Sequence, residues 1–540
     1  MIHFLITLTI LSSTPKIEVD WVLYNGTIYT VDASFSSVQA MAINDGKILA
    51  TGNSESILER YTSEKVTDLE GKAVYPGFID AHCHFLYYGV EKSFAMLDGT
   101  KSFEEVIDLV KKHDPAKTGG WIIGRGWDQN DWGVKEFPDC RILDELFPET
   151  PVFLTRIDGH AGLANSKALE LAGINAATKI DGGVITVSGE KCTGLLIDNA
   201  MTPVQDILPI KEKEFQKNAL LLAQKDAVKV GLTGVHDAGV EPWQIELIDE
   251  MQKKEKLKMR IYAMVSWSDS NYQYFFDKGK IKTERLNVRS FKCYADGALG
   301  SRGAALLEDY SDEPGNKGLL FSTFDSLQGI ARRIYGLGFQ MCTHAIGDAA
   351  NRQALDIYGG ILFKQNDYRW RIEHCQVVNP NDFVKFWKYS VIASVQPTHA
   401  TSDMYWADER LGGTRVKTAY AYKDLLRRNN FLAIGSDFPV ESVNPLYGFY
   451  ASVARKDLQG FPPEGFQKEN ALTREEALRG MTIWAAFAAF EENEKGSLEK
   501  GKFADFVILD DDIMHIKAER IPETKVLMTV INGEVVFQEL

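Results

Sequence analysis

The feature that most constrains the fold of this chain is a series of eight short apolar runs separated by stretches with helix-like spacing. Many of the runs are continuously apolar, as expected of parallel strands covered on both faces. Polar or charged residues stand at the carboxyl ends of many of them. This pattern favours a (β/α)₈ barrel, in which chemistry collects at the carboxyl ends of the strands. The expected strands cover residues 73–81, 234–237, 259–265, 290–294, 340–344, 370–374, 392–396 and 431–435.

Length and composition exclude several classes of protein. The chain has 540 residues, of which 45% are hydrophobic and 25% charged, so it is neither one small module nor mainly disordered. The formal net charge is −15, so the chain has no excess of basic residues to bind a phosphate backbone. We therefore expect no nucleic-acid partner. No uncharged run reaches the length of about 18 apolar residues that a membrane span requires.

Short β-like runs gather at both ends of the chain. Asn-Gly and Asp-Gly pairs supply the positive φ of a primed turn, which predicts two hairpins near the amino terminus. Neither end has enough strands for a stable sheet by itself, so we expect both ends to join one β-sandwich. These runs cover residues 21–24 with 27–31, 40–43 with 47–50, and, near the carboxyl terminus, 505–509, 526–531 and 534–537.

The domain organisation follows from these two patterns. We expect the sandwich to combine residues 19–72 with 496–540, and the barrel domain to span residues 73–495. The gap between His84 and Gly234 is too long for one crossover helix. We therefore expect residues 100–210 to form an insertion that caps the barrel mouth.

Residues 1–18 have two interpretations. An apolar run over residues 4–11 is followed by small residues, which resembles a short secretory leader, although no Lys or Arg precedes it. The alternative is a disordered tail at the start of the chain. Location is therefore left open between the cytoplasm and export.

Two histidines end the first expected barrel strand. His82 and His84 are two residues apart, so on a strand both imidazoles share a face. With ten histidines in 540 residues, such a pair arises by chance about 0.2 times per chain, and the motif alone is weak. Its place after a buried strand strengthens it.

Three further residues of types that bind metals stand at the carboxyl ends of other expected barrel strands. His344 and His374 end the fifth and sixth expected strands, and Asp437 follows the eighth. Any one of them could be a capping or hydrogen-bonded buried side chain. Four histidines and one aspartate in such positions are harder to ascribe to packing, and imidazole and carboxylate are preferred ligands of divalent cations such as Zn²⁺. The sequence therefore predicts a divalent metal site at the carboxyl end of the barrel.

Several motifs together resemble a known family. PGFIDAHCH, HAIGD, IEHC and GSDFP resemble the amidohydrolase superfamily. FKCYADGALGSRGAA and GRGWDQN are similar to amidohydrolase family 3, the YtcJ-like branch that includes N-substituted formamide deformylase. The resemblance runs from about Trp21 to the carboxyl terminus. It implies a metal-dependent (β/α)₈ barrel with a composite β-sandwich, and a hydrolase acting on carbon–nitrogen bonds other than peptide bonds.

The resemblance also implies a binuclear centre with two Zn²⁺ per chain, bridged by a carboxylated Lys292. An ammonium facing two dications is repelled and loses its proton, and the neutral amine can then take up CO₂. The alternative is that Lys292 neutralises Asp296 beside a single metal. The implied ligands are His82, His84, Lys292, His344, His374 and Asp437.

The expected reaction is cleavage of an amide-type bond, such as that of an N-substituted formamide, in a small-molecule substrate by a metal-bound hydroxide. Asp437 would accept a proton during the attack and return it to the departing amine. Cyclic amides, esters and aminated heterocycles are alternative substrates, and a non-catalytic regulatory protein on the same scaffold is an alternative from another class. The intact ligand set argues against the last. The oligomeric state is left open, with a homodimer as one alternative.

Six further residues are candidates for substrate contact, and each has a structural alternative. They are Trp127, Asp128, His160, His236, Arg302 and His399. Glycines allow the loop with the tryptophan and aspartate to bend into the barrel mouth, although a surface turn with a buried tryptophan is equally open. The three histidines could stabilise an oxyanion or could pack behind the ligands. The arginine could bind a substrate anion or cap the loop after the fourth strand.

Overall fold

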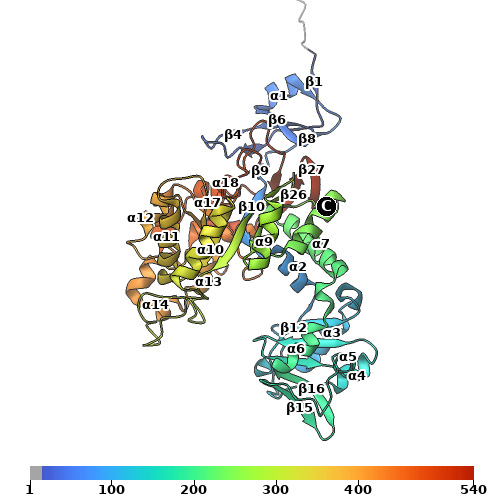
Figure 1. The fold of residues 1–540 in the computed structure, drawn as a ribbon. Coiled ribbons are helices and arrows are strands. Elements are labelled where there is room, and N and C mark those ends of the chain that lie inside the picture. The colour runs from blue at the N-terminus through green and yellow to red at the C-terminus, as the bar shows by residue number, and fades with distance from the viewer. Residues whose placement is uncertain (1–14, 540) are drawn as a thin grey trace, which may run out of the picture. The chain divides into compact units, whose positions relative to one another are not determined.

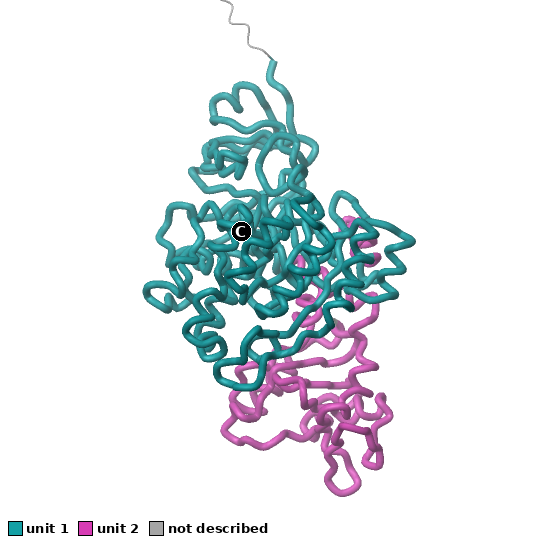
Figure 2. Tube along the Cα trace, turned by 60° about the vertical axis from the view of Figure 1, so that its left-hand side comes forward, with its two compact units in different colours: residues 1–84, 226–245, 258–540 teal, residues 85–225, 246–257 magenta. Residues whose placement is uncertain are grey.

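A computed structural model describes residues 15–539, so the expected leader lies outside the described residues. The chain divides into two compact units, coloured teal and magenta in Figure 2. Unit 1 contains residues 1–84, 226–245 and 258–540, and unit 2 contains residues 85–225 and 246–257. Across residues 15–539, no helix has both the length and the apolar character needed to cross a bilayer.

Eight parallel strands of unit 1 form a barrel, each pairing with the next in chain order. Figure 1 labels the first of them, β10. The last and first strands meet where Asp437 N donates to His82 O at 2.7 Å and His84 N donates to Phe438 O at 2.8 Å. The (β/α)₈ fold is thereby confirmed. The strands are β10 (Phe78–Cys83), β17 (Leu232–Val240), β18 (Arg260–Ser266), β20 (Leu286–Tyr294), β21 (Gln340–Ala345), β22 (Arg371–His374), β23 (Ile392–Val395) and β24 (Ala433–Ile434).

The expectation of one continuous strand over residues 73–81 is wrong. The run contains two strands, β9 (Ala73–Pro76) in an outer sheet and β10 in the barrel. Gly77 separates them, and a Cβ there would lie 2.3 Å from the side chain of Thr233. Only glycine fits this close approach, where the chain passes from one sheet to the other.

Amphipathic helices accompany the barrel strands. In α10 (Phe324–Gly336), Leu327, Ala331 and Ile334 are buried at spacings of four and three, which places them on one face. Thr323 caps this helix by accepting a hydrogen bond from Ser326 N. The other helices of this region are α9 (Asp269–Lys278), α11 (Asp348–Leu362), α12 (Phe383–Tyr389), α13 (Pro397–Asp403), α14 (Ala407–Arg415), α15 (Tyr422–Asn429), α16 (Pro445–Ala454), α17 (Arg474–Gly480) and α18 (Ile483–Ala488). Two more helices, α7 (Lys213–Lys229) and α8 (Pro242–Lys253), each contain residues of both units.

Two outer sheets of unit 1 share one hydrophobic core. One has the order β6-β5-β2-β8, and the other, β27-β26-β25-β9-β3-β4, joins strands from both chain ends. Trp21 and Met41 of the first sheet pack in one cluster with Phe506 and Val530 of the second. The expectation that both ends join one sandwich is confirmed. The strands are β2 (Trp21–Tyr24), β3 (Thr27–Tyr29), β4 (Ser37–Val38), β5 (Ala40–Asn44), β6 (Lys47–Gly52), β8 (Val66–Asp68), β25 (Phe506–Leu509), β26 (Val526–Ile531) and β27 (Glu534–Gln538).

One of the two amino-terminal hairpins forms. Strands β5 and β6 pair antiparallel around Asp45-Gly46, as expected. The hairpin expected around Asn25-Gly26 is wrong, because β2 pairs with β5 and β8 whereas β3 pairs with β4 and β9. Entering two different sheets gives each strand partners on both edges, which an isolated hairpin cannot provide.

Unit 2 is an α/β body around a six-stranded sheet of order β11-β12-β13-β14-β16-β15. Phe153 and Leu154 are adjacent on one strand and belong to different hydrophobic clusters, so the sheet is covered on both faces. The insertion expected over residues 100–210 lies within this unit, and its role as a cap stays a prediction. The elements are β11 (Ala95–Met96), β12 (Ile122–Trp127), β13 (Val152–Arg156), β14 (Ala161–Ala164), β15 (Gly183–Ser188), β16 (Lys191–Asp198), α2 (Phe85–Lys92), α3 (Phe103–Lys111), α4 (Arg141–Leu146), α5 (Ser166–Leu171) and α6 (Thr202–Asp206).

Candidate metal centre

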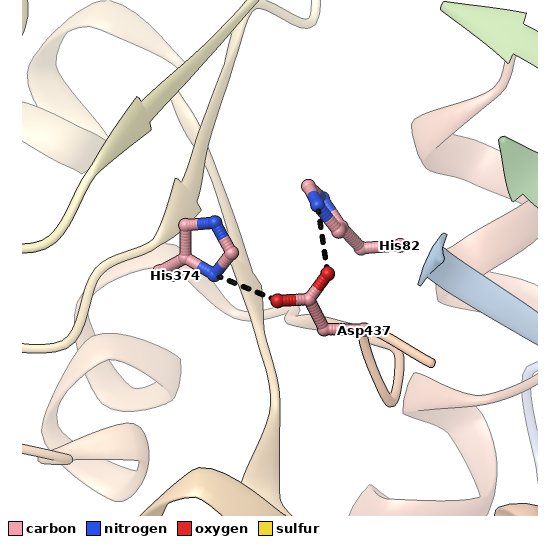
Figure 3. Close-up of side chains that lie close together, drawn as sticks. All are labelled: His82, His374 and Asp437. Atoms are coloured by element: carbon pink, nitrogen blue, oxygen red, sulfur yellow. Dashed lines mark ion pairs between the residues drawn. The ribbon is translucent and has the colours of Figure 1, made fainter. Parts of the chain in front are cut away.

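Three metal-ligand side chains converge at the carboxyl end of the barrel (Figure 3). His82 lies in β10, His374 ends β22, and Asp437 follows β24. Their donor atoms all lie within 4.8 Å of one another. His82 Nε2 is 3.6 Å from Asp437 Oδ1, and His374 Nδ1 is 3.9 Å from Asp437 Oδ2. All three residues are buried, so the cluster lies inside the barrel end.

The other expected ligands lie around this cluster. His84 Nε2 is 3.3 Å from Asp437 Oδ1, while its Nδ1 is 2.9 Å from a backbone carbonyl oxygen. Lys292 Nζ is 3.1 Å from His82 Nε2. The ring of His344 lies edge-on to that of His374, with centroids 4.5 Å apart. The structure therefore gathers all six side chains at one barrel end.

The polar atoms at this barrel end fit a cation. Within residues 15–539, His344 Nε2 and His399 Nε2 are buried and form no hydrogen bond. A buried polar atom without a partner carries a desolvation cost of about 1–3 kcal/mol, so such atoms call for a ligand. Imidazole nitrogens beside the Asp437 carboxylate are the donors that borderline divalent cations such as Zn²⁺ prefer.

Burial also sets protonation states that suit metal binding. It lowers the pKa of His82 to about 4 and that of His344 to about 3, so both imidazoles are neutral near pH 7. Burial likewise lowers the pKa of Lys292 and favours its neutral amine. For Asp437, burial favours the acid, but the surrounding imidazoles outweigh it and hold the pKa well below its usual range. Neutral imidazoles and an anionic carboxylate are the forms that coordinate metals.

A buried ion pair fixes the ring of His82. Glu373 Oε2 lies 2.5 Å from His82 Nδ1, and Glu373 Oε1 lies 2.7 Å from Arg371 Nε. Arg371 also donates to Ala81 O at 2.6 Å and to Ser394 Oγ at 2.7 Å. A carboxylate at Nδ1 orients the imidazole and leaves Nε2 for the metal. Sequence reasoning missed this pair, although two charges within the apolar run that ends at residue 374 were a signal.

Two further contacts join the strands that carry the ligands. Asp80 accepts hydrogen bonds from His82 N at 3.0 Å and from Ser436 Oγ at 2.6 Å, which ties β10 to the end of β24. Gly435 allows this approach, since a Cβ there would lie 2.4 Å from His82 N. Neither role was visible in the sequence, because both depend on strands far apart in the chain.

The backbone itself is strained at two ligand positions. His374 has φ 75° and Asp437 has φ 64°, both in the left-handed region. Non-glycine residues there cost of order 1–3 kcal/mol each and persist only where the surroundings hold them. Such strain clusters at functional sites.

Three candidate substrate residues belong to unit 1. His399 Nε2 lies 3.8 Å from Asp437 Oδ2, at the edge of the cluster. His236 is fully buried, with Nδ1 3.0 Å from the Arg371 guanidinium. Arg302 forms an ion pair with Asp312 at 2.8 Å. The structure thus brings His399 to the donor cluster, while the other two have partners away from it.

The remaining three candidates belong to unit 2. Trp127 is 1% exposed and its Nε1 donates to a backbone carbonyl at 2.9 Å. Asp128 pairs with Arg156 at 2.6 Å, and the exposed His160 pairs with Asp198 at 2.8 Å. All three therefore have partners within their own unit, and their contact with substrate stays a prediction.

Comparison with known proteins gives consistent matches along nearly the whole chain. A model of the amidohydrolase family matches residues 65–537. The protein LONG AFTER FAR-RED 3 of Arabidopsis thaliana is 34% identical, with 98% of this chain and 94% of that protein covered. The putative amidohydrolase YtcJ of Bacillus subtilis is 30% identical, with coverages of 96% and 99%. The N-substituted formamide deformylase of Arthrobacter pascens is 27% identical, with coverages of 95% and 97%.

A solved structure agrees with these relatives. The crystal structure of an uncharacterized metal-dependent hydrolase from Pyrococcus horikoshii OT3 superposes with a TM-score of 0.77 at 29% identity. The match covers 92% of this chain and 99% of that one. The resemblance read from the sequence motifs is confirmed.

Proposed function

The chain belongs to the amidohydrolase family, and from this premise we propose that it is a metal-dependent hydrolase of small molecules that cleaves an amide-type carbon–nitrogen bond. An N-substituted formamide is the substrate we favour, because a relative of that activity matches the chain over nearly its full length. The observation that carries the proposal is the convergence of the donor atoms of His82, His374 and Asp437 within 4.8 Å at the carboxyl end of the barrel.

We propose two Zn²⁺ per chain, held by the six residues predicted from the sequence, with Lys292 carboxylated. The short approach of Lys292 Nζ to His82 Nε2, 3.1 Å, supports a place for Lys292 in the ligand set. Within residues 15–539, no ion pair joins Lys292 to Asp296, whose oxygens instead accept backbone N–H groups of Ala305, Ile346 and Gly347. This favours Lys292 as a ligand over its role as a partner of Asp296.

When bound, divalent cations acidify water toward neutral pH and polarise a carbonyl group. The chain's own residues handle the proton and the developing charge. The Asp437 carboxylate accepts a proton at the start of bond cleavage and returns it to the departing amine, which otherwise leaves poorly as an anion. His399 Nε2 forms no hydrogen bond within residues 15–539 and, when it carries the proton, can donate to an oxyanion beside Asp437.

Metal content and turnover test the proposal together. The purified chain is analysed for bound metals and assayed against a panel of N-substituted formamides and acylated amines, before and after treatment with a chelator. We expect about two Zn²⁺ per chain, hydrolysis of at least one member of the panel, and recovery of activity when Zn²⁺ is returned to the stripped protein.

Two outcomes would contradict the proposal in different ways. A chain that binds metal but cleaves only cyclic amides, esters or aminated heterocycles retains the mechanism and loses the substrate assignment. A chain with less than about one bound divalent ion, and no turnover, would favour a non-catalytic regulatory role on the same scaffold.

A further inference from the structure

A cavity of about 300 Å³ lies in unit 1, between α13 with the chain after it and α16 with the segments on either side. Its walls include Thr398, Ser402 and Tyr405 on one side and Glu441 and Tyr447 on the other. None of these residues holds a place in the ligand set.

Two residues of the cavity wall are close in the chain to residues of the candidate metal centre. Thr398 directly precedes His399, whose Nε2 is 3.8 Å from Asp437 Oδ2. Glu441 follows Asp437 by four residues. The cavity wall and the donor cluster therefore share two segments of the chain, α13 and the segment that follows β24.

Two polar groups in the wall are free to bind a ligand. Thr398 is only 8% exposed, and its Oγ1 forms no hydrogen bond within residues 15–539. Glu441 accepts a hydrogen bond from Ser402 Oγ at 2.6 Å, and in the described part of the chain no Lys, Arg or His forms an ion pair with it. The cavity thus contains a carboxylate without a counter-ion.

The other charges of the wall have partners. Lys456 Nζ lies 3.5 Å from Glu519. Asp457 accepts hydrogen bonds from the Tyr405 hydroxyl and from the backbone N–H groups of Gln459 and Phe461. Asp457 thus has three hydrogen-bond donors, whereas Glu441 has the single donor Ser402 Oγ and keeps the greater capacity to accept an ammonium group.

Aromatic rings complete the wall. Tyr405, Tyr447 and Tyr450 all line the cavity, and the ring of Tyr405 is stacked on Phe461 with centroids 5.6 Å apart. Tyrosine faces attract cations and cover apolar bodies. A carboxylate without a counter-ion, a buried hydroxyl oxygen and tyrosine faces together are complementary to an ammonium group on an apolar or aromatic body.

We propose that this cavity is a subsite for a protonated amine carried by the substrate, with Glu441 as its counter-ion and Thr398 Oγ1 as a hydrogen-bond acceptor. The substrate class is then an amide that bears a cationic amine at a distance from the bond that is cleaved. That the bound amine is a substrate rests on the proposed hydrolase function. Binding of an ammonium group at Glu441 does not depend on that function.

Calorimetric binding of benzylammonium and of the neutral benzyl alcohol tests the subsite directly. We expect wild-type chain to bind benzylammonium more tightly than benzyl alcohol. Glu441→Gln should weaken benzylammonium binding about ten- to a hundredfold and leave benzyl alcohol unchanged, because a hydrogen bond to a charged group is lost. Glu464→Gln removes an exposed carboxylate that does not line the cavity and serves as the matched control.

A second variant and a kinetic comparison guard against a folding defect. Thr398→Val replaces the hydroxyl with a methyl group of similar size and should weaken benzylammonium binding severalfold. If an amide is hydrolysed, Glu441→Gln should raise KM for an ammonium-bearing substrate and leave kcat and the neutral analogue unchanged.

The outcomes separate the two proposals. Glu441-dependent binding of benzylammonium by a chain that hydrolyses no amide would keep the subsite and remove the hydrolase function. Equal binding of benzylammonium by wild-type and Glu441→Gln protein, or no preference for it over benzyl alcohol, would overturn the subsite even in an active enzyme.

Discussion

The two ends of the barrel treat buried polar groups in opposite ways. At the carboxyl end, His344 Nε2 and His399 Nε2 form no hydrogen bond within residues 15–539, and Asp437 has left-handed backbone. At the amino end, Arg260, the first residue of β18, pairs with Asp505 through two nitrogens, at 2.5 and 2.9 Å. Imidazole nitrogens are thus left without hydrogen bonds at one end, whereas this buried charge is paired at the other.

A second group of buried, paired charges lies at the amino end. Glu491 is buried and forms ion pairs with Lys282 and Lys495, each at 2.7 Å. Paired charges hold strands and connecting segments in place, whereas unpartnered donors hold them only when a ligand arrives. We infer that the amino end supports the fold and that the carboxyl end gives up stability for the proposed metal binding. Changes at the two ends should therefore separate turnover from stability.

The largest expected effect is on turnover at the carboxyl end. Asp437→Asn should keep bound metal but lower kcat by about 10²- to 10⁴-fold, because the amide cannot take up the proton that the departing amine needs. Steady-state kinetics with elemental analysis of the same sample measures both. Asp424→Asn, on the exposed side of α15, is the control. Turnover near that of wild type would remove Asp437 as the proton shuttle.

The next effect is on stability at the amino end. Arg260→Met should lower the free energy of unfolding by about 3–5 kcal/mol, because it leaves the buried Asp505 carboxylate without its partner. Chemical denaturation gives this value, and the folded variant should keep its kcat. The exposed Arg427→Met should stay within about 0.5 kcal/mol of wild type. A loss of kcat without a loss of stability would contradict the division between the two ends.

A smaller effect is expected from Glu373, a paired charge that supports the proposed metal ligands at the carboxyl end of the barrel. Glu373→Gln should weaken Zn²⁺ affinity about 10- to 100-fold, since the carboxylate at His82 Nδ1 orients the ring and raises its basicity. Competition with a chromophoric chelator measures the affinity on folded protein. Glu492→Gln breaks a partly exposed ion pair with Arg369 and should leave the Zn²⁺ affinity unchanged. Unchanged affinity in Glu373→Gln would make Glu373 a partner of Arg371 alone.

Local patterns predicted the positions of the barrel strands and of the donor cluster. A buried parallel strand is a short apolar run whatever lies beside it, and a spacing of two already places His82 and His84 on one face. Their place at the carboxyl ends of strands then brings distant residues together, because all parallel strands end at the same rim. His374 and Asp437 could be assigned in this way before any contact was known.

Contacts between distant strands could not be predicted in the same way. Glu373 meets His82 across 291 positions of the chain, and only the barrel's closure brings them together. The break at Gly77 was hidden because an apolar run looks the same whether one sheet or two receive it. The failed hairpin at Asn25-Gly26 has a similar cause, since turn residues specify a change of direction but not the sheet that the next strand joins.

The smallest expected effect is a pH dependence confined to the paired end. Burial favours the acid form of Glu491, but Lys495 and Lys282 outweigh it and lower its pKa to about 2. Because this lies below the value of about 4.3 for an unfolded chain, the pair stabilises the fold above that pH and loses its effect as pH falls toward 2. The stability difference between wild type and Glu491→Gln should therefore shrink by about 1–2 kcal/mol between pH 5 and pH 2.5. Denaturation at several pH values measures it, and parallel curves for the two proteins would show that Glu491 is not held ionised by its lysines.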